Sequence, residues 1–510
     1  MTHDGGGHLA RFTSYAQALR QGQLPPRWAP TFWDGYGYPI FNYYYPLPNI
    51  LALPFLLLPI SIETVGKIIL ILLLVAACFG IYLYLRIFID QSAIIFGVLI
   101  YLLAPFLFTN LYVRGAFGEL AAYAILPYCL LAIEKIKQKV SIINLAILYL
   151  IFILLPLSHN ILGGLIIVSV LIYAFFRLSW NRKLFYAYLL ICLGITTAVF
   201  FWLPMILEQR FVTLENTHLV NFNGQFPNLK QLFLSGFSYG RSDPQGEDTM
   251  SFGIGYLNLI IIILALISTF IKSRFRKQKL ILLALIGVAI FLMTPYSLWF
   301  WQLTPKLQLI QFPWRLLGVV SFLVSLLGAC LFYKQNWYAK IFLILLIGTA
   351  LFQLSKIPLP EMVRQEDFYY QTYSDTSTFS DEVRPVSLTI NRGIASVPGP
   401  ITQKIQTANI LKWNGSYHLY EMESDQEVDV TENTAYFPGW QTKIDDQSVE
   451  ITYAKTNGLI SYTVPPGKHL VKTRFTQQTT ARLIGNSLSL IALVITIIFL
   501  LYLKKNRIIK

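Results

Sequence analysis

The start of this 510-residue chain, MTHDGGGHLARF, places one carboxylate between two histidines. Asp4 directly follows His3, and three glycines separate it from His8. A carboxylate in such a polar stretch can take a proton from a substrate hydroxyl or hold a divalent cation. We therefore take Asp4 as a candidate catalytic residue, and His3 and His8 as candidate substrate-binding residues. The alternative interpretation of Asp4 is a solvated loop aspartate.

A second carboxylate, Glu119, lies in the segment VRGAFGELAAYAILP, where an apolar run begins. A carboxylate that enters an apolar helix is costly, so it is usually paired or functional. Arg114 can pair with it, or can bind a phosphate through two parallel hydrogen bonds. Glu119 is therefore a second catalytic candidate and Arg114 a substrate-binding candidate. The alternative is a structural ion pair at the membrane interface.

Four further polar residues could bind a substrate. His159 and Asn160 lie at a turn between two apolar runs, where they can bind phosphate or hydroxyl groups, or can simply bond the helix ends. Arg315, in QFPWR, can meet a lipid phosphate or reach toward headgroups. Arg27 belongs to an aromatic stretch that could form an external wall against a sugar or lipid, or an ordinary interfacial belt. Its members are Trp28, Trp33, Tyr36, Tyr38, Phe41, Tyr43, Tyr44 and Tyr45.

The elements that must position these residues are membrane-spanning helices. The chain is 55% hydrophobic and 13% charged, with a mean hydropathy of +0.54, whereas soluble domains carry about 25% charged residues. Apolar runs long enough to cross a bilayer recur along it. The four cysteines have the spacing of neither a disulfide framework nor a metal site. The net charge of +14 comes largely from short loops, so it indicates membrane topology and not nucleic-acid binding.

Eleven spans are predicted, at 63–86, 92–112, 117–134, 141–157, 160–177, 184–207, 251–272, 280–297, 313–333, 340–355 and 483–503. If residues 1–62 are outside, every strongly basic short loop falls on the inner side of the membrane. Counting the proline-rich run 46–60 as a span would break this agreement, so it is predicted to be interfacial or re-entrant. Residues 8–21 predict an amphipathic helix at the membrane surface.

Four regions follow from this topology. They are an external loop (1–62), a multi-span domain (63–355), an extracytoplasmic β-rich domain (356–482) and a last span with a basic tail (483–510). In the third region, alternating residues predict strands at 417–423, 434–444, 449–454, 459–464 and 469–475, which together would form a small sandwich. Residues 436–440 are expected to form a turn and part of its core.

The start of the chain lacks a helix that would carry it across the membrane. Met1 is then either an internal start within a longer gene, or the first residue of a polar N-terminus that crosses unaided. We expect the first, in which case an in-frame run of about 20 apolar codons lies upstream.

Six segments in order carry a resemblance to a known family. They are HDGGGHLARF, PPRW with GYGYPIFNYYYPLP, VRGAFGELAAYAILP, SHN, QFPWR, and AYFPGWQTKIDD with VPPGKH. The chain resembles, over almost its whole length, the YfhO-like membrane proteins, also named 6-pyruvoyl-tetrahydropterin synthase-related. That group resembles the GT-C glycosyltransferases, apart from a first helix that this sequence lacks. The pterin name implies no zinc site here, because no zinc-type histidine set is present.

The resemblance implies an enzyme of the cytoplasmic membrane with an extracytoplasmic active site. It would move a sugar from a polyprenyl-phosphate carrier to a cell-envelope polymer, with Asp4 as the acid/base or metal-holding residue. Arg114, Glu119, His159 and Arg315 would line the donor phosphate. The cofactor is left open, with a divalent cation as one alternative. The rivals are a transporter or flippase of lipid-linked sugars and a non-catalytic envelope assembly protein.

Overall fold

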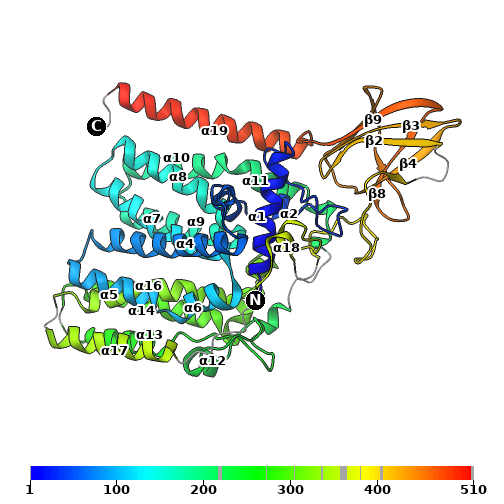
Figure 1. The fold of residues 1–510 in the computed structure, drawn as a ribbon. Helices are drawn as coiled ribbons and strands as arrows, with labels where there is room; N and C mark the ends of the chain where they lie inside the picture. Colours follow the sequence, from blue (N-terminus) through cyan, green and yellow to red (C-terminus); the bar gives the residue numbers. More distant parts are fainter. Residues whose placement is uncertain are drawn as a thin grey trace.

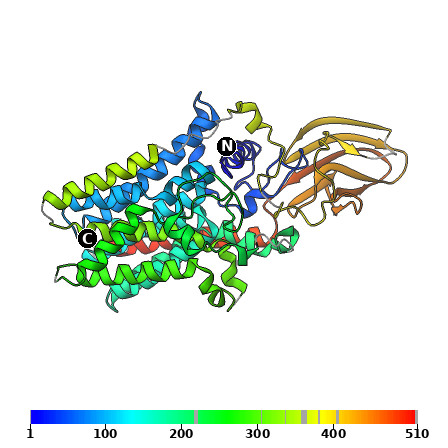
Figure 2. The same cartoon turned by 90° about the horizontal axis from the view of Figure 1, so that it is seen from below.

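The computed structural model describes residues 2–215, 221–271, 273–303, 305–334, 337–355, 364–378, 381–401 and 406–506. Most of them form a bundle of long helices that lie side by side, and a β-rich domain projects beyond one end of the bundle (Figure 1). The C-terminus lies at the other end. A view from below shows the same elongated arrangement (Figure 2).

The bundle helices follow the predicted apolar runs. They are α4 (Ile62–Leu85), α5 (Gln91–Leu102), α7 (Phe117–Gln138), α8 (Ile142–Ser158), α9 (Asn160–Arg177), α10 (Arg182–Thr197), α11 (Val199–Leu207), α13 (Tyr256–Ser268), α14 (Arg276–Met293), α16 (Leu316–Leu331), α17 (Trp337–Ser355) and α19 (Thr480–Lys505). Among the described residues, five helices are long and apolar enough to cross a membrane. The number rises to eight if each of three bent pairs is one span.

The bent pairs are where the structure departs most from straight predicted spans. α5 is followed, at 49°, by α6 (Pro105–Phe108) and the π-helical turn η2 (Thr109–Arg114). α10 meets α11 at 61°, and α14 meets η6 (Pro295–Ser297) and α15 (Leu298–Trp301) at 87°. Pro105 and Pro295 stand at two of these breaks, and proline lacks the N–H that a continuous helix needs.

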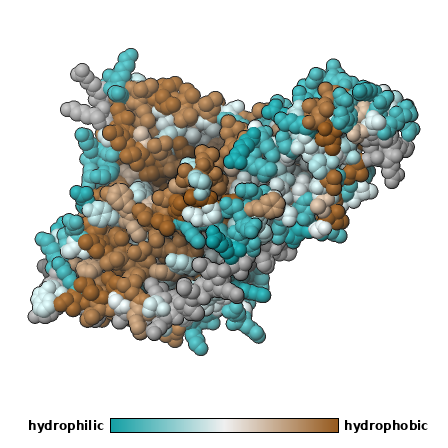
Figure 3. Space-filling view, in the orientation of Figure 1, coloured by the Kyte–Doolittle hydropathy of each residue, from teal (hydrophilic) through white to brown (hydrophobic). Residues whose placement is uncertain are grey.

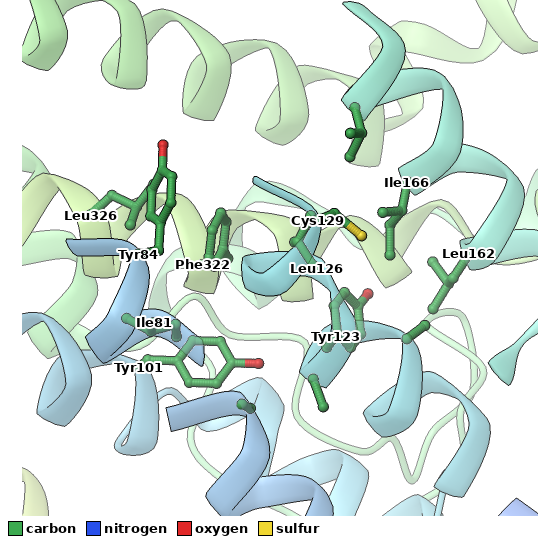
Figure 4. Close-up of a cluster of buried hydrophobic side chains, with 14 of the residues drawn as sticks. Ile81, Tyr84, Tyr101, Tyr123, Leu126, Cys129, Leu162, Ile166, Phe322 and Leu326 are labelled. Carbon is green, nitrogen blue, oxygen red and sulfur yellow. The ribbon is translucent and has the colours of Figure 1, made fainter. Parts of the chain in front are cut away.

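The bundle is apolar inside and on its sides. α4 packs on α7, α5 on α16, and α7 on α8, around side chains such as Tyr101, Tyr123, Cys129 and Phe322 (Figure 4). Apolar side chains also form a broad belt over the outer surface of the helices, whereas the visible face of the β-rich domain is largely polar with a few apolar patches (Figure 3). An exposed apolar belt of this kind suits contact with lipid.

The N-terminal helix α1 (Gly5–Arg20) runs across the ends of the bundle helices on the side of the β-rich domain (Figure 1). It packs against α3 (Leu47–Ala52), α4 and α18 (Asp367–Gln371). Arg11, Phe12, Ser14 and Tyr15 are all buried, on several sides of the helix. The helix predicted at residues 8–21 is confirmed, but it does not have one exposed polar face, because protein encloses α1. The proline-rich run 46–60 forms only α3 and the short turn η1 (Phe55–Leu57).

The β-rich domain is a two-sheet sandwich. Its strands are β1 (Pro400–Ile401), β2 (Thr407–Asn414), β3 (Tyr417–Ser424), β4 (Val428–Ala435), β5 (Trp440–Ile444), β6 (Gln447–Val449), β7 (Thr452–Tyr453), β8 (Leu459–Val464) and β9 (Gly467–Phe475). One sheet has the order β1-β4-β8-β7 and the other β2-β3-β9-β5-β6. Every pairing between these strands is antiparallel.

The predicted strand at 434–444 is in fact two. β4 ends at Ala435, and a turn around Gly439, whose φ is +110°, leads into β5. Only the last two residues of β4 were predicted, because Glu432 is fully buried on its inner face, where it accepts hydrogen bonds from Tyr462 and Thr473. A charged residue at an inward position hides the usual alternation of polar and apolar residues.

The aromatic stretch after Arg27 does not form an external wall. Trp28, Trp33, Tyr38 and Phe41 are buried. The ring of Trp28 lies 5.6 Å from that of Phe475 and close to two further aromatic rings of the sandwich. These side chains fill the junction between the N-terminal segment and the β-rich domain, which a sequence pattern alone cannot separate from an interfacial belt.

Candidate functional site

Glu119 is shared by two arginines in the interior of the bundle. Its two carboxylate oxygens accept hydrogen bonds from both terminal nitrogens of Arg114, at 2.6 and 2.7 Å, and from Nε of Arg315 at 2.8 Å. All three side chains are buried, with exposed fractions of 2% for Glu119, 6% for Arg114 and 7% for Arg315. Two cations and one carboxylate leave a net charge of +1 in this cluster.

Local backbone structure positions the cluster. η2 ends at Arg114, Gly115 follows with a φ of +63°, and α7 begins at Phe117, so Arg114 and Glu119 face each other across a tight turn. On the other side, η8 (Pro313–Arg315) precedes α16. The hydroxyl of Tyr123 donates to the carbonyl of Arg315 at 2.6 Å, which ties α7 to α16.

Further bonds fix the orientation of the arginines. Arg114 donates to Oδ1 of Asn110 at 2.7 Å, and its guanidinium lies 4.8 Å from the ring centre of Trp314. Arg315 donates to the carbonyl of Ile310 at 2.8 Å. Both guanidinium groups are held in place before any ligand binds, which favours recognition of an anion.

Asp4 lies at the edge of this cluster. The backbone N–H of His3 donates to the carbonyl of Val113 at 2.9 Å, and that of Asp4 donates to the carbonyl of Arg114 at 2.8 Å. The side chains of His3 and Asp4 are exposed. Asp4 precedes α1 without capping it, and its carboxylate forms no ion pair with any described residue. The chain thus holds the backbone of Asp4 firmly and leaves its carboxylate available.

Three rings complete the site. Tyr45 stacks on His159 with ring centres 5.0 Å apart, and His8 lies 6.1 Å from Tyr45 and 5.1 Å from Phe117. Nδ1 of His159 accepts a hydrogen bond from the N–H of Leu162 at 3.2 Å, which caps α9 and leaves the other ring nitrogen as the proton carrier of the neutral ring. His159 thus caps α9 and also lies beside Tyr45 in the candidate site.

The charges of the site reach these rings. Burial raises the pKa of the Tyr45 hydroxyl to about 12, and the charges of Arg11, Asp4, Glu119 and Arg315 also act on it. Burial, with Arg11 next, lowers the pKa of His8 well below its ordinary value, so His8 is neutral at pH 7. No ring nitrogen of His8 bonds to a described residue, so it remains available as a donor or acceptor.

Residues 41–357 match the model of a membrane-protein family described as the 6-pyruvoyl-tetrahydropterin synthase related domain. The chain belongs to this family. The matched part of the chain includes Tyr45, Arg114, Glu119, His159 and Arg315. Asp4, His8 and the β sandwich lie outside it. The family description names a membrane protein and no reaction. A search of curated proteins found no match.

Two expected substrate-binding residues use their side chains to hold parts of the protein together. Arg27 is 1% exposed and donates to Gln477, Asn42 and the carbonyl of Phe200 at 2.6–2.9 Å. Burial and the charge of Arg482 lower the pKa of Arg27 to about 9. Its donors are taken by the protein, so it joins the N-terminal segment to the β-rich domain and does not bind substrate.

Asn160 also has a structural role. Its amide nitrogen donates to the carbonyl of Tyr43 at 2.8 Å, and it lies 3.2 Å from the sulfur of Met205. Glu119 needs a correction as well: with both oxygens occupied by arginines and almost no exposure, it cannot act as a proton acceptor and instead orients Arg114 and Arg315. Tyr45, which the sequence left among eight aromatic residues, is a site residue that pattern alone could not single out.

The described residues contain no group of three or more histidine, cysteine, aspartate or glutamate side chains close enough to hold a metal ion. A divalent cation at Asp4 would therefore need ligands from the substrate, as is common for magnesium bound between a carboxylate and phosphate oxygens.

Proposed function

We propose that this chain is a membrane glycosyltransferase of the GT-C type. It moves a sugar from a polyprenyl-phosphate carrier to a cell-envelope polymer. One observation supports this most directly: Asp4, an exposed carboxylate, is fixed by a backbone hydrogen bond to Arg114, whose side chain belongs to a buried cluster of net charge +1. The proposed proton acceptor, Asp4, and the proposed anion-binding residue, Arg114, therefore lie on two neighbouring segments of the chain.

The chemistry uses these parts in a single displacement. Asp4 takes the proton of an acceptor hydroxyl while that oxygen forms a bond to C1 of the sugar. The bond between C1 and the phosphate oxygen breaks, and its electron pair leaves with the polyprenyl phosphate. Arg114 and Arg315 stabilise the charge that develops on this phosphate, because they are oriented before the reaction and lie in a water-poor site.

His159, Tyr45 and His8 are proposed to bind the donor. They can offer hydrogen bonds to phosphate or sugar hydroxyl groups from one side of the cluster. Glu119 is a positioning residue in this scheme, since it holds the two arginines at a fixed separation. The charge of the cluster suits one phosphate group, which is the leaving group of a polyprenyl-monophosphate donor.

We place the site on the outer face of the cytoplasmic membrane, with eleven spans as the topology. This placement is supported by the positions of the basic residues and of the β-rich domain relative to the helix bundle. α1 and the β-rich domain lie at one end of the bundle, and α19 ends in Lys504 and Lys505 at the other end (Figure 1). Basic residues prefer the cytoplasmic side of a membrane, which supports the proposal that the site end is the outer one.

A transporter of lipid-linked sugars is the second candidate. The three bent helix pairs favour it, because transporters often bind substrate where helices are interrupted. Vesicles that contain the purified chain distinguish the two candidates. A transporter moves the lipid-linked sugar between leaflets without forming a glycosylated product.

Replacement of Asp4 tests the proposal. The protein is reconstituted in liposomes with polyprenyl-phosphate sugars and cell-envelope polymer, and transfer of labelled sugar is measured. Asp4→Asn keeps the size of the side chain but removes its basicity, so the transfer rate should fall by about 10² to 10⁴-fold. Asp4→Glu should retain part of the activity.

Asp446→Asn is the matched control, because Asp446 is exposed in the turn between β5 and β6 and aspartate and asparagine both tolerate its φ of +66°. It should transfer sugar at the original rate. Normal transfer by well-folded Asp4→Asn protein would reject the catalytic role of Asp4.

A further inference from the structure

The outer face of the five-stranded sheet carries a row of lysines. Residues of β3, β9 and β5 alternate between the sandwich core and solvent. On the solvent side, Lys412 of β2 is opposite Leu419 of β3, Leu419 is opposite Lys472 of β9, and Lys472 is opposite Lys443 of β5. The three lysines are exposed. Three cations therefore line up across four neighbouring strands.

A fourth cation lies in the adjacent row. Arg474 is exposed and is opposite Tyr417 on one side and Gln441 on the other. Nζ of Lys412 lies 5.5 Å from the ring centre of Tyr417. We call Lys412, Lys443, Lys472 and Arg474 the cationic sheet face. None of the four forms an ion pair with a described residue, whereas Lys468, further along β9, lies 3.8 Å from Glu421.

This arrangement is unfavourable for the sandwich by itself. Like charges on directly opposite residues of neighbouring strands destabilise a sheet, and Lys443 and Lys472 are such a pair. The other sheet shows no such enrichment, since the outward residues of β4 and β8 are Asp429, Thr431, Asn433, Ser461 and Thr463. The same face also carries Glu421 and Glu423 of β3, of which Glu421 pairs with Lys468, but none of the four cations of the cationic sheet face forms an ion pair with a described residue. Cations left without a carboxylate partner in this way are typical of a surface that binds an anion.

A hollow continues the face toward the helices. It has a volume of about 290 Å³ and lies between Arg474, Gln477 and Gln478 on one side and the turn at Gly22 and Gln23 on the other. β9 leads from here through residues 476–479 into α19. The cationic sheet face therefore runs from the body of the sandwich to the end of the domain that adjoins the bundle.

We infer that the cationic sheet face binds a polyanionic chain with repeating phosphate or carboxylate groups. Neighbouring strands are about 4.8 Å apart, so the row from Lys412 to Lys443 spans roughly 14 Å. That length exceeds a single phosphate and suits successive charges along a polymer. Amide and aromatic side chains beside the row, Gln441 and Tyr417, can contact the uncharged parts of the same chain.

A flat bilayer fits this face less well. β3 and β9 run away from the bundle, roughly along the direction of its helices, in both views (Figures 1 and 2). The plane of the sheet is therefore roughly parallel to the bundle helices, so the cationic sheet face does not lie flat against the membrane. The identification of the bound polymer as the sugar acceptor rests on the proposed function. The binding of the polymer to the cationic sheet face does not depend on that function.

Binding is tested with the full-length protein in nanodiscs of neutral lipid, using fluorescent polyphosphate as the probe and neutral dextran as the comparison. The triple variant Lys412→Gln, Lys443→Gln, Lys472→Gln should bind polyphosphate at least tenfold more weakly at low salt and show a shallower salt dependence. The original protein should not bind dextran.

The control variant Lys139→Gln, Lys455→Gln, Lys504→Gln removes the same total charge from exposed positions outside the five-stranded sheet and should bind polyphosphate normally. Equal loss in both variants, or no loss in the triple variant, would overturn the inference. So would loss of binding to phosphatidylglycerol vesicles with unchanged polyphosphate binding, because the face would then serve a membrane.

Sugar transfer is measured in parallel. If the original protein transfers no sugar but the triple variant binds polyphosphate weakly, the inference is supported and the proposed function is rejected. Normal polyphosphate binding by the triple variant, together with Asp4-dependent transfer, rejects the inference alone.

Discussion

Glu119 illustrates how one carboxylate can organise a buried site. It accepts three short hydrogen bonds from two arginines, and hardly any of it is exposed. Removing charged groups from water is costly, so each arginine depends on this carboxylate for compensation. The same group that makes the anion site also keeps the site folded.

Glu119→Gln should therefore destabilise the protein. The two guanidinium groups would remain buried without a counter-charge, and loss of one partner of a buried pair costs about 3–5 kcal/mol. Unfolding of the detergent-solubilised protein measures the effect. Glu421→Gln removes one partner of the exposed pair with Lys468 and should cost less than about 1 kcal/mol. Similar losses in the two variants would contradict this account.

At the scale of elements, the start of α7 is the part that brings the rings and charges together. Gly118 lies in its first turn, directly before Glu119, and the ring of Tyr45 occupies the space beside it. A Cβ at position 118 would lie 2.2 Å from a ring carbon of Tyr45. The absence of a side chain there allows Tyr45 to stack on His159.

Gly118→Ala should displace Tyr45 and cost roughly 1–3 kcal/mol, as overpacking of a filled interior does. Sugar transfer should fall in the same variant, because the stack on His159 would be lost. Gly164→Ala, in α9, is the matched control: a Cβ there meets no atom within 4 Å. It should be neutral or slightly stabilising, since alanine favours a helix. Equal stability of the two variants would refute the packing argument.

At the scale of the whole molecule, a second buried carboxylate connects the bundle to the sandwich. Glu208, after α11, forms an ion pair at 3.0 Å with Arg482 of α19 and accepts from Asn42 at 3.0 Å. Arg482 also donates to the carbonyl of Pro438 in the sandwich, and Asn42 accepts from Arg27. The N-terminal segment, the end of α11, the sandwich and the start of α19 are thus connected around the carboxylate of Glu208.

Glu208→Gln should loosen this junction. Arg482 is fully buried, so loss of its counter-charge should cost about 3–5 kcal/mol and expose the connection at 476–479. Hydrogen exchange of that segment is the direct measurement, and faster exchange is expected. Arg392→Gln breaks an exposed pair with Asp375 and should leave the exchange unchanged. Unaltered exchange in Glu208→Gln would show that the junction does not depend on this charge.

Much of the helical fold was predictable, because runs of apolar residues have one common solution in a bilayer. The ranges 63–86 and 160–177 nearly coincide with α4 and α9. Two of the bends were missed although Pro105 and Pro295 mark them in the sequence, because the predicted ranges 92–112 and 280–297 were drawn as straight spans from their overall apolar character. β2 was missed because it is an exposed edge strand without a polar–apolar alternation.

The candidate site was predictable in part. Asp4, Arg114, Glu119, His159 and Arg315 lie near one another in the structure, although they come from four separate segments of the chain. Arg27 looked equally suitable in the sequence, but tertiary packing assigns it to a junction. The role of Tyr45 depends on a neighbouring glycine and a stacked ring, which are relations in space that no local pattern encodes.

The double pairing of Glu119 has a consequence for how the chain is made. Arg114 and Glu119 are five positions apart and can neutralise each other as soon as that turn forms, whereas Arg315 follows 196 positions after Glu119. A nascent chain that has inserted α7 therefore carries a neutral pair. When α16 is inserted later, Arg315 at its start has no carboxylate partner until α16 packs against α7. The charge of Arg315 is therefore compensated only in the assembled bundle, so this ion pair makes the docking of α16 on α7 favourable.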